Sequence, residues 1–136
     1  MREEEMENTT SEAPEGAQLD TLTGSIIPCI IKVHKALGPG FHESVYRNAL
    51  VSEMTRSGLA VESEKEIPIS YEGQVVGSQK LDAVVENQVI LKLMTVEGIA
   101  PVHYAQMRSY LRATGLKVGL VVNFALERSD FRRVEL

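Results

Sequence analysis

Apolar residues with a helical period open the ordered part of the chain. From Thr21 to Leu37 they fall largely on one helix face, and they are Leu22, Ile26, Ile27, Ile30, Ile31, Val33 and Leu37. Pro28 interrupts this stretch. Because an interior proline costs about 3 kcal/mol, we expect a kink there or a helix whose regular part starts later. The glycine and proline residues at 38–40 should end the helix.

A second helix is predicted over residues 42–57, ending at Gly58. Its inward positions are expected to be Val45, Ala49, Leu50 and Met54. A third helix is predicted over residues 101–114, because proline suits the first helical turn and Gly115 follows the last.

Strand patterns fill the rest of the chain. Residues 59–69 alternate in polarity, residues 71–74 are typical of a hairpin turn, and residues 75–85 form the returning strand. Residues 89–95 are rich in Val, Ile and Leu, which favours a central strand covered on both faces. Residues 118–124 predict another buried strand, and residues 131–136 a last edge strand. The element order indicates an α/β fold with a mixed sheet flanked by helices.

Charge divides the chain into a tail and a body. Residues 1–20 contain seven acidic residues and one basic residue, so the net charge of −5 arises in this segment. We interpret residues 1–20 as a disordered acidic tail, with an acidic docking arm as the alternative, and residues 21–136 as one domain. The nearly neutral body gives no general argument for nucleic-acid binding, so any such site must be local.

The remaining composition narrows the class of protein. The N-terminus lacks the basic and apolar pattern of a signal peptide, and no apolar run is long enough to span a membrane, so we expect a cytoplasmic protein without a membrane partner. Cys29 is the only cysteine and should be a small buried apolar residue. The three histidines, His34, His42 and His103, have no metal-ligand spacing.

A short motif connects the sequence with a known family. Residues 40–46 read GFHESVY, which has the spacing G-x-x-E-x-x-Y, and the chain resembles the GxxExxY family of the PD-(D/E)XK nuclease superfamily. The likeness extends through KLDAVVENQVI, VEGIAPVHYAQMRSYLRATGLKVGLVVNF and RRVEL. It implies a restriction-endonuclease-like αβββαβ core.

The resemblance also implies a set of site residues. In such folds an acid at the position of Glu43 helps to hold a divalent cation, Mg²⁺ or Mn²⁺, and an acid at the position of Asp82 is its principal ligand. The next strand normally carries Glu or Asp and then Lys two residues later, because alternate residues of a strand share a face. This chain instead has Lys92 and Met94 at those two positions.

This departure decides the predicted chemistry. With two of the four central groups replaced, we expect no bound cofactor and an ion pair between Lys92 and Asp82 or Glu43. Gln106 and Tyr110, one helical turn apart, match a pair that lies near the active site in RecB-type relatives, although a hydrogen-bonded helix face explains them equally well. Tyr46 is expected to be a half-buried phenol beside Glu43.

Three functions remain open from the sequence. The first is a degenerate nuclease-like protein that acts as a binding or assembly module. The second is a nuclease that still cuts DNA or RNA with Mg²⁺ or Mn²⁺. It would use Glu43 and Asp82, with Glu97 or the substrate's own phosphates completing the shell of the ion and Lys92 in the charge role of the lost lysine. The third is a structural protein that assembles through the edge at residues 131–136. The corresponding partners are nucleic acid, a second copy of the chain or another protein.

Overall fold

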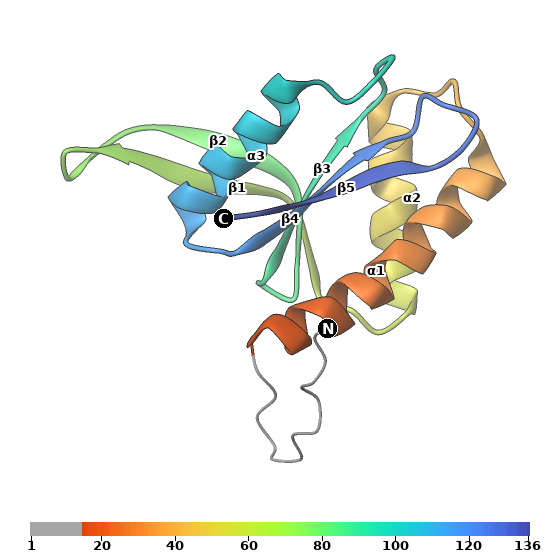
Figure 1. The fold of residues 1–136 in the computed structure, drawn as a ribbon, viewed down its shortest axis with the longest axis horizontal. Helices are drawn as coiled ribbons and strands as arrows, with labels where there is room; N and C mark the ends of the chain where they lie inside the picture. The colour runs from red at the N-terminus through yellow and green to blue at the C-terminus, as the bar shows by residue number, and fades with distance from the viewer. Residues whose placement is uncertain (1–14) are drawn as a thin grey trace, which may run out of the picture.

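The computed structural model describes residues 15–136, which form three helices and five strands (Figure 1). The helices are α1 (Glu15–Leu37), α2 (Glu43–Arg56) and α3 (Pro101–Thr114). The strands are β1 (Val61–Tyr71), β2 (Gln74–Val85), β3 (Val89–Met94), β4 (Val118–Asn123) and β5 (Asp130–Glu135).

The strands form one mixed sheet in the order β1-β2-β3-β4-β5. Neighbouring strands are antiparallel except β3 and β4, which are parallel and connected through α3. The central position of β3, predicted from its continuous apolar run, is confirmed. The hairpin of β1 and β2 is longer than the other strands and extends away from the body of the molecule (Figure 1).

Helices cover the sheet on both faces and define two cores. Side chains of α1 and α2 pack with Leu91 and Leu93 of β3, whereas Met107 and Leu111 of α3 pack with Ile90 and Met94. The alternation along β3 therefore feeds both cores, as expected for a strand that is buried on both sides.

Two features of the helices differ from the prediction. Helix α1 begins at Glu15, so residues 15–20 are helical rather than part of a tail, because Leu19 is buried in the core and Asp20 pairs with Arg133 of β5 at 2.7 Å. Residues 1–14 of the predicted tail lie outside the described residues. The helix also runs through Pro28, so a start after this proline is excluded.

Helix α2 differs from the prediction in which residues face the core. Val45 is exposed, and the neighbouring Tyr46 is fully buried rather than half-buried. The Tyr46 ring stacks on Phe124 with 4.5 Å between the ring centroids, and its hydroxyl donates a hydrogen bond to the Gly38 carbonyl. This phenol thus connects the loop before α2 with the end of β4.

No helix within residues 15–136 combines the length and apolar character needed to cross a membrane.

Candidate functional site

The site forms where β2 and β3 separate, at Asp82. The pairing of the two strands ends at Ala83 and Leu91, and beyond it an oxygen of Asp82 accepts a hydrogen bond of 2.7 Å from the Leu93 N–H. Leu81 packs in the α3 core while Ala83 packs in the α1–α2 core, so the alternation of β2 breaks at Asp82. The carboxylate therefore replaces a backbone acceptor and holds the separated strands together.

A second distortion lies on β1, next to Asp82. Glu64 has φ of 53°, an uncommon value for a residue other than glycine, between the pairs Ser63–Ala83 and Lys65–Leu81. Its carboxylate contacts Arg47 of α2 at 3.2 Å and Lys80 of β2 at 3.4 Å. These two ion pairs connect α2, β1 and β2 beside the site.

Glu43 lies in the first turn of α2 and is half-buried. Burial is the main cause that raises its pKa, followed by the negative charge of Asp82 and a hydrogen bond from protonated Glu43 to the Asp82 carboxylate. Lys92 and Arg47 act in the opposite direction but do not reverse the shift. The fold therefore brings Glu43 and Asp82 together, as the family resemblance implies.

Lys92 interacts with an aromatic ring instead of a carboxylate. Its ammonium nitrogen lies 5.9 Å from the centroid of the Tyr110 ring, within the range of a cation–π interaction. No carboxylate of residues 15–136 lies within ion-pair distance of it, so the predicted ion pair with Asp82 or Glu43 is wrong. The side chains of Leu91 and Leu93 face the α1–α2 core. Because alternate residues of a strand point to opposite faces, the Lys92 side chain between them points towards α3.

The other predicted site residues vary in their proximity to this centre. Tyr110 is half-buried, and burial together with the Asp82 charge raises its pKa. Gln106 is exposed one turn earlier on α3, and no hydrogen bond is found for it within the described chain. Met94 is 6% exposed and packs in the α3 core. Glu97 is exposed in the loop after β3.

A divalent cation meets an unfavourable donor set here. Glu43 and Asp82 are two carboxylates, one Asp82 oxygen already accepts the Leu93 N–H, and the positive charge of Lys92 acts on the same site. Mg²⁺ can be held by one or two carboxylates with water completing its octahedral shell, but here the adjacent ammonium of Lys92 opposes its binding. Within residues 15–136, no three His, Cys, Asp or Glu side chains are placed to share an ion.

Two of the three histidines have structural contacts in the described chain. His34 is buried, and its Nδ1 lies 3.3 Å from the Ser129 hydroxyl. His103 accepts a hydrogen bond of 2.8 Å from the Ala100 N–H, which satisfies a free donor at the start of α3. His42 is exposed at the N-cap of α2.

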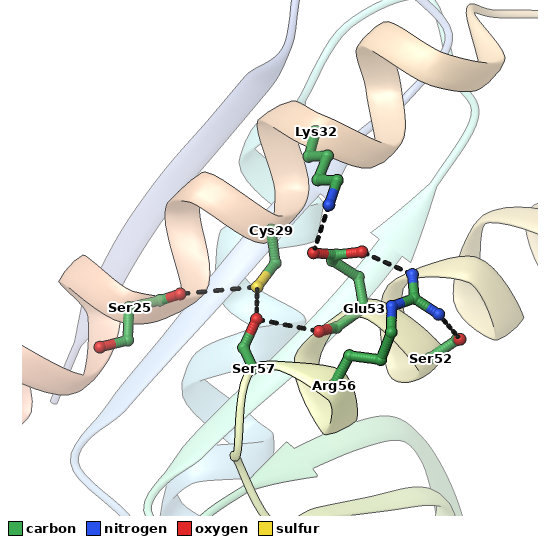
Figure 2. A network of polar contacts seen from close by, with 7 residues as sticks. All are labelled: Ser25, Cys29, Lys32, Ser52, Glu53, Arg56 and Ser57. Atoms are coloured by element: carbon green, nitrogen blue, oxygen red, sulfur yellow. Dashed lines mark hydrogen bonds and ion pairs between the residues drawn. The ribbon is translucent and has the colours of Figure 1, made fainter.

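A separate polar cluster fastens α2 to α1 (Figure 2). Glu53 of α2 binds Lys32 of α1 at 3.1 Å and Arg56 at 2.6 Å, and hydrogen bonds from these two cations lower its pKa. Next to it, the buried Cys29 lies 3.6 Å from the Ser57 hydroxyl (Figure 2). This cluster fixes the far end of α2, the helix whose first turn carries Glu43.

Sequence reasoning missed three residues around the site. Arg47 and Glu64 form the ion pair described above, and the position of Arg47, four residues after Glu43, was the available signal. The third is Asn123, which is fully buried and bonds both the N–H and the carbonyl of Val96, at 3.1 and 2.8 Å. An asparagine within an apolar strand pattern could have indicated this connection between the ends of β3 and β4.

Comparison with known proteins agrees with this architecture. The crystal structure of SSO0001 is similar with a TM-score of 0.56 and 19% sequence identity. The match covers 68% of this chain and 48% of that chain, so this chain spans about half of the similar structure. At this identity the likeness shows the fold, and the predicted restriction-endonuclease-like core is confirmed.

A search among curated proteins found no significant match. Residues 20–134 match the family profile described as the PD-(D/E)XK nuclease superfamily, which is most of the sequence. The strand separation at Asp82, the helix acid Glu43 and this match lead to one assignment: the chain belongs to the PD-(D/E)XK nuclease superfamily.

Proposed function

We propose that this chain is a GxxExxY-type protein that has lost metal-dependent phosphodiester hydrolysis and acts as a binding or assembly module. The observation that carries the proposal is the pair of replacements on β3. Lys92 occupies the position of an acid ligand, and Met94 occupies the position of the lysine while its side chain is buried in the α3 core.

The electrostatics of the site support the loss of metal chemistry. Two carboxylates that share a cation must both be ionised, and burial and the Asp82 charge, which raise the pKa of Glu43, oppose its ionisation. The positive charges of Lys92 and Arg47, which lower the pKa of Glu43, offset part of the negative charge of the two carboxylates without a metal ion. No lysine at position 94 is available to orient water or stabilise phosphate charge.

The test is a cleavage assay on single-stranded and double-stranded DNA and RNA with Mg²⁺ and with Mn²⁺. We expect no cleavage by the natural chain and no calorimetric signal for Mg²⁺ at millimolar concentration. The double variant Lys92→Glu, Met94→Lys should gain activity, whereas the matched control Lys92→Gln, Met94→Leu should stay inactive.

Circular dichroism would reveal whether the double variant folds. If it does not, the cleavage assay on the natural chain still tests the loss of hydrolysis. Cleavage by the natural chain that disappears in Asp82→Ala would overturn the proposal and favour the nuclease with a rearranged site. Fluorescence anisotropy with the same oligonucleotides, without divalent ions, tests nucleic acid as the partner of the inactive module.

A further inference from the structure

The hairpin arm exposes a strand edge that the sheet does not use. Strand β2 has 12 residues but pairs with β3 only at Ala83, Val84 and Val85. Apart from Val76, residues 74–80 pair with β1 on one side, and on the other side no backbone hydrogen bond is found among the described residues. In Figure 1 this part of the hairpin extends beyond the rest of the sheet. Its outward-facing backbone groups are therefore free to pair with another strand.

Charge distinguishes this edge from the two outer edges of the sheet. The outer edge of β1 carries several charges and Pro68, and four of the six residues of β5 are charged: Asp130, Arg132, Arg133 and Glu135. Charged residues and proline protect a strand edge against pairing. Residues 74–80 read QVVGSQK, with Lys80 as the single charge and no proline. Of these edges, only that of β2 lacks protection.

Exposed apolar side chains lie on the same arm. Tyr71, Val75 and Val76 are 68%, 68% and 61% exposed. Val76 has no partner on β1, because Ile69 pairs with Gly77 and Ser70 pairs with Val75. β-Branched residues favour strand pairing, and a second strand would cover part of this apolar surface.

We propose that residues 76–80 of β2 pair antiparallel with the same residues of a second copy, which makes the protein a two-fold dimer through its hairpin arms. The pairing is centred on Ser78, so Val76 faces Lys80 of the other copy and no two like charges meet. Residues 131–136, the assembly edge expected from the sequence, are less suited because of their charges. The inference is independent of the chemistry at Glu43 and Asp82.

Sedimentation velocity at micromolar concentration tests the dimer, with two charge variants at one position. Val76→Lys places an ammonium opposite Lys80 of the other copy and should weaken the dimer by about tenfold or more. Val76→Glu places a carboxylate opposite the same lysine and should weaken it less. Val102→Lys is the matched control, because Val102 is similarly exposed, at 58%, on α3. Circular dichroism checks that all variants fold.

A cross-link tests the register. Ser78→Cys should give a disulfide-linked dimer under mild oxidation, whereas Ser109→Cys, exposed on α3, should not. A monomeric natural chain, or a dimer that survives Val76→Lys, would overturn the proposal. A monomer that binds a synthetic strand peptide would assign the edge to another protein instead, and equal weakening by Lys and Glu at position 76 would contradict the Ser78-centred register.

Discussion

Glu43 and Asp82 are two like charges that the fold holds together in a partly buried place. Burial and the Asp82 charge raise the pKa of Glu43 above its ordinary value, so the folded chain binds a proton at Glu43 more tightly than the unfolded chain does. The stabilisation from this proton is fully present at pH values below the pKa that Glu43 has in the unfolded chain. The stabilisation is lost as the pH rises through the higher folded pKa.

Glu43→Gln should therefore raise the melting temperature near neutral pH, because the amide removes the repulsion and can still donate a hydrogen bond to Asp82. The difference from the natural chain should shrink as the pH falls towards 4, where Glu43 is protonated in both states. Thermal unfolding between pH 4 and 8 measures it. Glu97→Gln, at an exposed acid, is the control; an equal effect there, or one independent of pH, would contradict the account.

The positions of site residues were more predictable than their contacts. The family resemblance was enough to bring Glu43 and Asp82 into one site. The partner of Lys92 was not predictable, because the choice between a carboxylate and the Tyr110 ring depends on side-chain direction at separating strands. The left-handed backbone of Glu64 also has no sequence signal, since glycine rather than glutamate marks such positions.

At the scale of elements, apolar patterns together with turn and helix-end residues predicted every helix and strand of the described chain, and boundaries failed where tertiary contacts decide them. Composition assigned residues 15–20 to a tail, but Leu19 enters the core and Asp20 pairs with Arg133. These partners are distant in sequence, so local patterns could not indicate them. Likewise, Pro28 is tolerated inside α1 because the tertiary packing of the helix outweighs its low propensity.

The packing of α3 on the sheet depends on one glycine. A Cβ atom at Gly119 of β4 would overlap the Met107 side chain of α3, which is fully buried. Gly119→Ala should lower the free energy of unfolding by about 1–3 kcal/mol, the usual cost of overpacking a core. Urea denaturation measures the change.

A double-mutant cycle identifies the cause of this loss. In a Met107→Ala background the overlap is gone, so Gly119→Ala should cost clearly less than in the natural chain. An equal cost in both backgrounds would show that the destabilisation comes from the backbone of β4 and not from contact with α3. Gly77→Ala, where a Cβ would meet nothing, controls for a general effect of alanine in a strand.

At the scale of the whole molecule, the charge of Lys92 should couple the stability of the fold to metal binding. The ammonium of Lys92 lowers the pKa of Glu43 and offsets part of the repulsion from Asp82, so we expect the natural chain to need no cation to fold. A third carboxylate in its place would add repulsion that a divalent ion could relieve. The stability of such a variant should then depend on Mg²⁺, whether or not it cleaves anything.

Lys92→Glu should accordingly melt below the natural chain without divalent ions and recover when they are added. For an ion bound with a dissociation constant of about 1 mM, 10 mM Mg²⁺ stabilises the folded state by about 1.4 kcal/mol, which for a domain of this size raises the melting temperature by several degrees. The natural chain and Lys35→Glu, a charge reversal on the exposed face of α1, should show no such rise. Equal stabilisation of the natural chain by Mg²⁺ would mean that Glu43 and Asp82 bind the ion despite Lys92, and the proposed loss of metal chemistry would fail.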